Sequence, residues 1–435
     1  MKKQVLALVL AALMVCALFA GCASKPAANE QNTPATDEQN TPATTEQNTP
    51  AETKDYGTGE IKIWVADNVT AFTEEQAKAF MDAHPEFAGY TVTVEPVGEG
   101  DATNNVLTDV ESAADIFGFA QDQLSRLVTA GAVIPVADEN AAKVAADNDA
   151  GSVAAATLGG VMYAYPLTSD NGYFLYYDKS VVTDPTTLEA VIKSCEDAGK
   201  GFYMEINSGW YQPAFFFGAG CTLTYDTADD GSFTACNIDY ASDNGLAALK
   251  ALIALHKSPA FNNGSSVGNA TNAAAIVDGT WDAGAAKELF GENYACAKLP
   301  TFTVDGATYQ LSGFGGFKLL GVKPQTDENK LAVCDALAAY LSSPEVQLAR
   351  YNAVQWGPSA LEAQKNEAVQ ADEALAALGE QLAFAIPQGQ YPGDYWSLAT
   401  ALGDSIIGGE YDTADDVALM DALKTFQDTC ISYAK

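Results

Sequence analysis

The chain is poor in positive charge. It has 22 lysines and arginines against 57 aspartates and glutamates, which gives a formal net charge of −35. Proteins that bind nucleic acid or anionic lipid surfaces use clustered cations to neutralise phosphate groups, and the sequence contains no basic stretch. The composition therefore argues against both kinds of partner. We interpret most of the acidic residues as a solvated surface that keeps the protein soluble.

Motifs of common catalytic and cofactor sites are also missing. No GxSxG, P-loop or HExxH pattern occurs, and the only histidines, His84 and His256, each lie near the end of a helical pattern. The glycines at 98–100 and 313–316 lack the flanking strand, the spacing and the helix of a dinucleotide fingerprint, so we interpret both as turns. With 57 acidic residues, spacing alone cannot identify the carboxylate pair of a glycosidase. We expect a protein that is not an enzyme and that carries no cofactor.

The cysteines form no metal-ligand pattern. No CxxC and no Cys/His cluster occurs, which argues against a zinc site. Cys221 and Cys236 flank two β-rich segments, 222–226 and 231–235, with an Asp-Asp-Gly turn between them, and this pattern predicts a β-hairpin. The two cysteines either pair as a cross-strand disulfide or remain two buried free thiols.

The N-terminus has the pattern of an exported lipoprotein. Two lysines follow Met1, an apolar run covers residues 5–20, and Gly21 and Cys22 come next. A basic start, a short apolar core and small residues at the end are typical of a secretory signal. The alternative is an uncleaved membrane helix, but the run is shorter than the roughly 20 residues that span a bilayer. We predict a signal peptide over residues 1–21 and a lipobox-like site with lipidation at Cys22, although Phe19 stands where leucine is more usual.

A repeated polar segment follows. Copies of Glu-Gln-Asn-Thr-Pro-Ala begin at Glu30, Glu38 and Glu46, and they contain no aromatic or large aliphatic residue. Such a segment cannot bury enough apolar surface to offset the entropy of ordering it. We therefore predict a disordered tether over residues 22–57, and no later apolar run is long enough to cross a membrane.

The rest of the chain is longer than a single hydrophobic core usually supports, so we expect two lobes. Segments with strand periodicity alternate with helical ones, and the pattern restarts after residue 166. This alternation predicts parallel sheets and an α/β fold, in which ligands bind beyond the carboxyl ends of the strands. The strands are predicted at 60–65, 90–95, 114–118, 173–177 and 201–206, and the helices at 72–84, 103–112, 122–130, 185–198 and 244–256, with a mostly helical last quarter.

Four of the five tryptophans lie beside turn residues. These are Trp210, Trp281, Trp356 and Trp396, whereas Trp64 lies inside a predicted strand and is interpreted as core. Binding residues collect on loops over a rigid scaffold. A sugar ring suits such a surface, because its C–H face stacks on an indole while its hydroxyls bond to Asp, Asn and Gln. The alternative is that one or two of these indoles only pack at the edges of the lobes.

Short segments in a specific order carry a family resemblance. They are ADIFGFAQD at 114–122, YAYP at 163–166, YYDK at 176–179, AIVDGTW at 275–281, KLPTF at 298–302 and Tyr395-Trp396. From about residue 61 to the C-terminus the chain resembles the maltose/maltodextrin-binding proteins of ABC importers, of the Gram-positive lipoprotein type, within the extracellular solute-binding proteins. The resemblance implies an α/β, two-lobed periplasmic-binding-protein fold with a multi-strand hinge and a ligand cleft between the lobes. It assigns residues 58–168 plus 313–370 to the N-terminal lobe and 169–312 plus 371–435 to the C-terminal lobe.

The same resemblance implies which residues hold the ligand. It implies aromatic stacking, hydroxyl acceptors and polar contacts at Asp67, Asp101, Phe119, Asp122, Asp170, Asn171, Asn207, Trp210, Tyr211, Trp281, Trp356, Tyr391 and Trp396. Three positions that carry a lysine or an arginine in the family are Val69, Gln123 and Thr400 here. The cleft is therefore less cationic, and its hydrogen bonds to a ligand must differ from those of the family. Three further segments are similar in sequence to those of Gram-positive members, at 170–176, 356–359 and 387–391. The first expectation for the ligand is therefore an α-1,4-glucan.

The expected function is capture of malto-oligosaccharides for import by a monomeric, lipid-anchored binding protein. It would act at the extracellular face of the cytoplasmic membrane of a Gram-positive type cell and deliver the oligosaccharide to ABC permease subunits encoded elsewhere. The only membrane contact would be the lipid, and no metal and no nucleic acid would bind. The alternatives are a binding protein for another oligosaccharide, or a surface polysaccharide-binding lipoprotein without a transport role.

Overall fold

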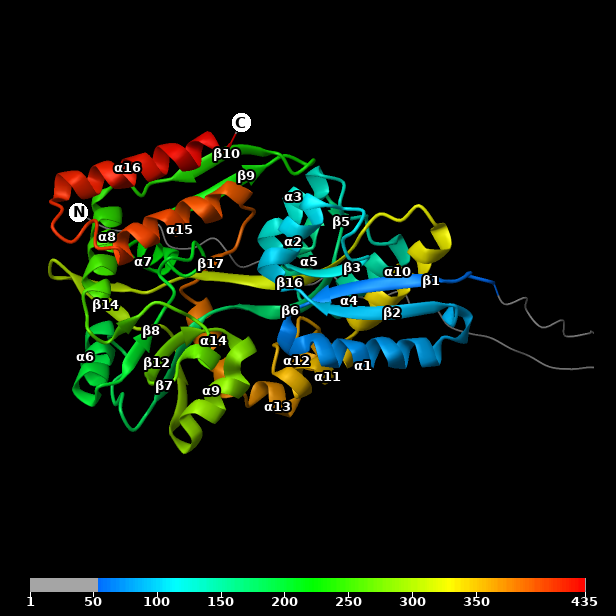
Figure 1. The fold of residues 1–435 in the computed structure, drawn as a ribbon, viewed down its shortest axis with the longest axis horizontal. Coiled ribbons are helices and arrows are strands. Elements are labelled where there is room, and N and C mark those ends of the chain that lie inside the picture. The colour runs from blue at the N-terminus through cyan, green and yellow to red at the C-terminus, as the bar shows by residue number, and fades with distance from the viewer. Residues whose placement is uncertain (1–53, 435) are drawn as a thin grey trace, which may run out of the picture. The chain divides into compact units, whose positions relative to one another are not determined.

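Two separate β-sheets organise the protein (Figure 1). The structure is a computed structural model that describes residues 54–434. The predicted signal peptide, the lipidation site at Cys22 and most of the predicted tether lie outside the described residues.

The first sheet has the order β17-β16-β3-β1-β2, with β6 paired to β16. Strand β1 runs parallel to β2 and β3, whereas β16 runs antiparallel to β3 and β6. Its strands are β1 (Gly59–Val65), β2 (Tyr90–Pro96), β3 (Ile116–Ala120), β6 (Tyr165–Gly172), β16 (Phe314–Val322) and β17 (Ile386–Pro387). The helices that pack on or beside it are α1 (Asp67–Ala83), α2 (Glu99–Thr108), α3 (Leu124–Thr129), α4 (Asp138–Asp147), α5 (Ala150–Ala155), α10 (Glu328–Leu341), α11 (Pro344–Val354), α12 (Leu361–Gln364) and α13 (Glu367–Gln370).

The second sheet has the order β11-β8-β12-β7-β13. Strand β7 is antiparallel to both of its neighbours, and β8 is parallel to β11 and β12. Its strands are β7 (Phe174–Asp178), β8 (Gly201–Tyr203), β11 (Phe261–Asn262), β12 (Ala273–Asp278) and β13 (Tyr294–Ala297). The helices of this part are α6 (Leu188–Ala198), α7 (Pro213–Gly218), α8 (Asp243–His256), α9 (Ala283–Phe290), α14 (Glu373–Leu382), α15 (Gly393–Ile407) and α16 (Asp416–Ser432).

Strands β6 and β16 connect the two parts. They pair antiparallel from Leu320 opposite Tyr165 to Gly315 opposite Gly172, and β6 leads directly into β7 of the second sheet. Figure 1 shows both strands passing between the two sheet regions. This arrangement supplies the multi-strand connection that the predicted two-lobed fold requires.

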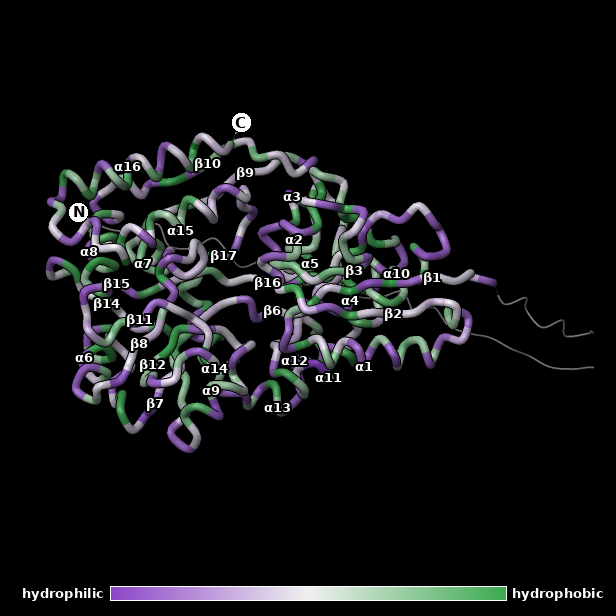
Figure 2. Tube along the Cα trace, in the orientation of Figure 1, coloured by the Kyte–Doolittle hydropathy of each residue, from purple (hydrophilic) through white to green (hydrophobic). Residues whose placement is uncertain are grey.

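Alternating burial explains why these segments form strands and helices. Ile61, Ile63 and Val65 of β1 are buried with Phe80 of α1, and Leu337 of α10 belongs to the same apolar cluster. Figure 2 shows hydrophobic and hydrophilic residues alternating along the outer helices α1 and α16, as expected for helices with one face on the core. Among residues 54–434, no helix is both long enough and apolar enough to cross a bilayer.

The predicted hairpin is present, and of the two alternatives for its cysteines the structure has free thiols, with Cys221 buried and Cys236 half-buried. Strands β9 (Leu223–Thr227) and β10 (Phe233–Ile238) pair antiparallel, and the register places Cys236 opposite Tyr225. Cys221 precedes β9, so it does not face Cys236 across the ladder, and both cysteines are free. Two further short pairs are β4 (Thr157–Leu158) with β5 (Val161–Met162) and β14 (Thr301–Val304) with β15 (Ala307–Gln310).

One predicted boundary is wrong in a way that matters for the site. The helix expected from residue 72 begins at Asp67, directly after β1. The Thr-Glu-Glu segment that suggested a start at Thr73 lies inside this helix. Asp67 therefore occupies the first turn of α1, where a negative charge is favourable because unpaired backbone N–H groups point toward it.

Candidate ligand-binding site

A cavity of about 660 Å³ lies where the first sheet meets loops of the second-sheet region. It opens beyond the carboxyl ends of β1 and β3, because Asp67 directly follows the first of these strands and Asp122 the second. This is the position that an α/β sheet favours for its ligands. The predicted residues that line it are Asp67, Asp101, Asp122, Asn171, Trp210, Tyr211, Trp281, Trp356 and Trp396.

Tryptophans reach the cavity from different directions. The rings of Trp210 and Trp281 lie 5.8 Å apart at 45°. Trp210 is supported by edge-on contacts with Tyr173, at 4.7 Å, and Tyr211, at 4.9 Å. These packed neighbours restrict the indole, so its free face is held in place before any ligand arrives.

Trp396 forms a second aromatic surface, at the start of α15. Its ring packs against Tyr395, at 4.9 Å, and Tyr391, at 5.6 Å. Its indole Nε1 is buried and has no hydrogen-bond partner among residues 54–434. A buried donor without a partner costs free energy, so this N–H is a candidate for bonding to a ligand oxygen.

Trp281 depends on the glycine before it. The ring folds back so closely that a Cβ on Gly279 would lie 2.1 Å from the indole. The main-chain carbonyl of Trp281 accepts a hydrogen bond from Asn68 Nδ2 at 3.2 Å. A loop that follows β12 of the second sheet is therefore joined directly to α1 of the first.

Lys318 of β16 is a feature that sequence reasoning missed. Only 4% of this residue is exposed, and its Nζ lies 3.7 Å from the ring centre of Trp356 and 4.7 Å from that of Trp281. Within the described part of the chain no carboxylate lies within ion-pair distance of this ammonium. The indole faces offset part of its desolvation, and its N–H groups are available to a ligand in the cavity. The ammonium also covers one face of Trp356, which leaves that indole less room for stacking than expected.

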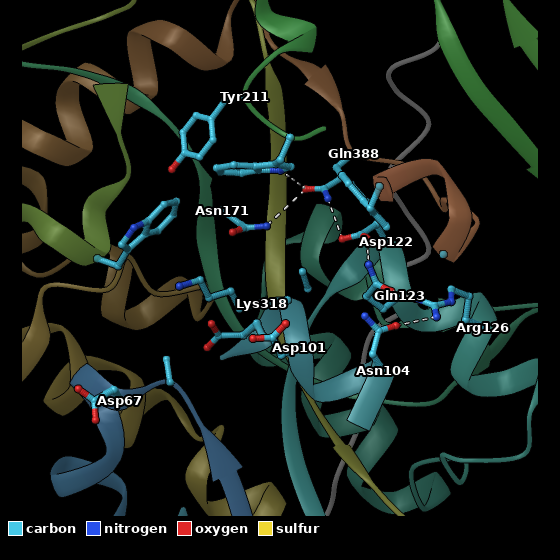
Figure 3. Close-up of a pocket in the computed structure, with 18 of the residues that line it drawn as sticks. Asp67, Asp101, Asn104, Asp122, Gln123, Arg126, Asn171, Tyr211, Lys318 and Gln388 are labelled. Carbon is cyan, nitrogen blue, oxygen red and sulfur yellow. Dashed lines mark hydrogen bonds between the residues drawn. The ribbon is translucent and has the colours of Figure 1, made fainter. Parts of the chain in front are cut away.

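Polar side chains form a connected row along one wall, which Figure 3 shows from Asn171 to Arg126. Asp122 Oδ1 accepts from Gln388 Nε2 at 2.7 Å, and its other oxygen accepts from Gln123 Nε2. Arg126 donates to Gln123 Oε1 at 2.6 Å. Asp122 is 1% exposed, and this burial raises the pKa of its carboxyl to about 7. Hydrogen bonds from Gln123 and the charge of Arg126 act in the opposite direction.

Four residues predicted as contacts, Phe119, Asp170, Asn207 and Tyr391, are not among those that line this cavity. Phe119 is 0% exposed and packs beside Phe117 in an apolar cluster behind β3. Asp170 is buried, and its Oδ2 accepts from Thr280 Oγ1 and the Gly357 amide, whereas its Oδ1 has no hydrogen-bond partner among residues 54–434.

The other two are held by neighbouring side chains or backbone. Asn207 donates to Asp404 at 2.9 Å and accepts from Asn263 at 2.7 Å. Tyr391 is buried, and its hydroxyl donates to the Leu223 carbonyl at 2.8 Å. Because Asn207 and Tyr391 already bond to protein groups away from the cavity, we assign these two residues to the structure that surrounds it.

Several lining residues were not predicted as contacts. Besides Lys318 and Gln388, they include Asn68, Glu99, Asn104, Gln123, Arg126 and Asp282. Glu99 and Asp101 lie in the first turn of α2, as Asp67 does in α1. Acidic side chains are favourable at helix N-termini, which explains part of the negative charge that lines the cavity. In residues 54–434 no group of three or more His, Cys, Asp or Glu side chains is placed to hold a metal ion.

The comparison with protein families identifies the chain. The family model of the bacterial extracellular solute-binding proteins matches residues 75–377, which is more than half of the sequence. The chain belongs to this family. Among curated solute-binding proteins, the galactooligosaccharide-binding protein of Bacillus subtilis (strain 168) is 25% identical over 257 residues. That match covers 55% of this chain and 59% of the relative, so it spans little more than half of the relative's length.

Solved structures share the fold over most of the chain. One described as "with acarbose" has a TM-score of 0.76 and 28% identity, covering 87% of this chain and 100% of its own. The maltodextrin-binding protein from L. casei BL23 without ligand gives 0.67 and 24%, covering 87% and 99%. The Thermus thermophilus maltotriose-binding protein bound with maltotriose gives 0.71 and 20%, covering 85% and 100%. The fold is thus the two-lobed, mixed α/β fold of periplasmic binding proteins.

Proposed function

We propose that this solute-binding protein captures malto-oligosaccharides, that is α-1,4-glucans, for import by an ABC transporter. The observation that supports it most is the cavity itself, where Trp210 and Trp281 face Asp122, Asn171 and other polar side chains. Sugar rings have an apolar face and a hydroxyl edge, and this pairing of indoles with acceptors and donors matches both.

The size of the cavity fits a short oligosaccharide. Its volume of about 660 Å³ falls within the roughly 300–1,000 Å³ of typical small-molecule sites. The choice of α-1,4-linked glucose rests on likeness to structures described with acarbose and with maltotriose. One aromatic position expected from that likeness, Phe119, is buried, so we assign stacking to Trp210, Trp281 and Trp396.

Binding would favour a closed arrangement of the lobes. We propose residues 58–168 plus 313–370 as one lobe and 169–312 plus 371–435 as the other, with β6 and β16 as crossing strands. Ligand that touches Asp67 on one proposed lobe and Trp396 on the other stabilises the arrangement in which both are within reach. The monomeric protein, anchored through lipid on Cys22 at the extracellular face of the membrane, would then deliver the sugar to a permease.

A galacto-oligosaccharide is the second candidate ligand, because the curated relative is named for binding one. Its hydroxyls would meet the same acidic and amide groups in the cavity. The two proposals differ only in which stereochemistry the polar row accepts.

Isothermal titration calorimetry with a matched set of trisaccharides separates the candidates. We expect heat and one bound molecule with maltotriose, and none with cellotriose, which has the same glucose units in β-1,4 linkage. If only a galactosyl trisaccharide gives heat, a galacto-oligosaccharide would replace the α-1,4-glucan as the proposed ligand. No heat with any oligosaccharide would refute the proposed function. Product analysis after long incubation with maltotriose should show intact sugar.

A further inference from the structure

Gln388 joins the two halves of the site through its side-chain amide. It lies in the segment between β17 and α15, lines the cavity and is 3% exposed. Its Nε2 donates to Asp122 Oδ1 at 2.7 Å. Its Oε1 accepts from Trp210 Nε1 at 3.2 Å and from Asn171 Nδ2 at 3.4 Å. Figure 3 shows these bonds converging on the one amide.

Chemistry sets the direction of this amide. An indole N–H can only donate, so the Gln388 atom that faces Trp210 must be the oxygen. The nitrogen is then turned to Asp122, where it donates to a carboxylate. A glutamine is the right residue here because the position needs one acceptor and one donor on opposite sides.

Neighbouring residues hold the segment in place. The Gln388 carbonyl accepts from Gln121 Nε2, which binds the loop after β17 to the loop after β3. A Cβ on Gly316 of β16 would lie 2.9 Å from Gln388 Oε1, closer than real Cβ contacts come. The absence of a side chain at residue 316 therefore makes room for the amide.

We propose that Gln388 is a positioning residue, which holds the Asp122 carboxylate and the Trp210 indole at a fixed separation across the floor of the cavity. Asp122 follows a strand of the first sheet, whereas Trp210 lies in the second-sheet region. A ligand that bonds to one group then finds the other already placed, which lowers the ordering cost of binding. The inference rests on the proposed function for its ligand, but not for the contact.

Gln388→Glu and Gln388→Met test the contact with maltotriose as the probe. The glutamate retains the acceptor toward Trp210 but sets a carboxylate against Asp122, and two carboxylates this close cannot both be ionised. At about pH 8 we expect affinity to fall by about 10-fold or more, and at about pH 5, where the pair shares a proton, by less than about 3-fold. The methionine has neither donor nor acceptor, so its loss should be similar at both pH values.

Two further variants separate positioning from folding and from charge. Gly316→Ala crowds the Gln388 amide, and with it Gln121 Oε1 at the same 2.9 Å, without altering the chemistry of either side chain. We expect an affinity loss of about 3-fold or more at both pH values. Gln370→Glu adds the same charge at an exposed position on α13, away from the cavity. Its affinity should stay within about 2-fold of that of the unaltered protein.

A ligand-free measurement keeps the inference independent of the sugar. Urea unfolding of Gln388→Met, Trp210→Phe and the double variant forms a double-mutant cycle. The double variant should lose less stability than the sum of the single variants, because each single change removes the same Trp210–Gln388 bond, which can be lost only once. Additive losses, or a Gln388→Glu protein that binds maltotriose normally at both pH values, would overturn the proposal. If the unaltered protein binds no malto-oligosaccharide, the proposed function fails, while the cycle still decides the contact.

Discussion

Replacing Trp281 by alanine is the most informative single change to the site. The indole comes from the loop after β12, yet it packs against the apolar cluster of the first sheet. It lies 5.8 Å from the ring of Trp210 and 4.7 Å from the Lys318 ammonium. Its removal therefore takes away a proposed stacking surface, a cation–π partner and a contact between the two sheet regions.

The magnitude follows from these contacts. Truncating a central aromatic anchor usually costs about 2 kcal/mol or more of binding free energy, which is roughly 30-fold in affinity. Trp281→Phe retains a smaller ring, so we expect a loss of about 5-fold. Because Trp281 is only half-buried, the free energy of unfolding should fall by no more than about 2 kcal/mol, less than for a fully buried tryptophan.

Calorimetry with maltotriose and urea unfolding on the same samples measure both quantities. Trp64→Phe is the matched control, since Trp64 is also half-buried but bonds to Glu95 away from the cavity. It should alter stability without altering affinity by more than about 2-fold. A Trp281→Ala protein that is folded and binds maltotriose as tightly as the control would refute the assignment of Trp281 to the ligand site.

Four further predictions concern other parts of the molecule. Lys318→Met should weaken maltotriose binding by about 10-fold in calorimetry, because the lost ammonium pairs with no carboxylate of residues 54–434 and is free to bond to the ligand. Unchanged affinity would place the lysine outside the contacts. Gly279→Ala should weaken maltotriose binding, since its Cβ would lie 2.1 Å from the Trp281 ring and must displace it. The tryptophan fluorescence spectrum of this variant should differ from that of the unaltered protein. Burial raises the pKa of Asp122 to about 7 from 3.8, so its contribution to stability is fully present below about pH 4 and is lost as the pH rises through about 7. The difference corresponds to at most roughly 4 kcal/mol, and urea unfolding of Asp122→Asn across this range should show a flatter profile. Cys221 and Cys236 should both be alkylated in denaturant without reductant, and a mass that rises only after reduction would contradict the register of the hairpin.

Local patterns in the sequence predicted most of the fold. The strand at 60–65 and the hairpin near 222–236 have alternation or turn residues that need no tertiary information, and both are present. The start of α1 was missed because a helix that follows a strand without a loop offers no capping residue such as Ser or Thr at its beginning. The change from strand to helix at Ala66 becomes apparent only once the end of β1 in the sheet is known.

The site was harder to predict because side-chain direction decides it. Residue 119 aligns with a family stacking position, but alternate residues of a strand face opposite sides, and Phe119 faces the core. Lys318 and Gln388 lie in segments far apart in the sequence from Trp281 and Asp122, and they meet only through the crossing strands. The sequence signals that could have found these positions are a lysine inside an apolar strand, at Lys318, and a glutamine directly after a proline, at Gln388.

A crystal structure with maltotriose tests the central claim most directly. We predict one sugar chain in the cavity, stacked on Trp210, Trp281 and Trp396, with a hydroxyl donating to Asp122 and the lobes closed around it. An ordered sugar bound elsewhere on the protein, or an empty cavity at saturating maltotriose, would contradict the account.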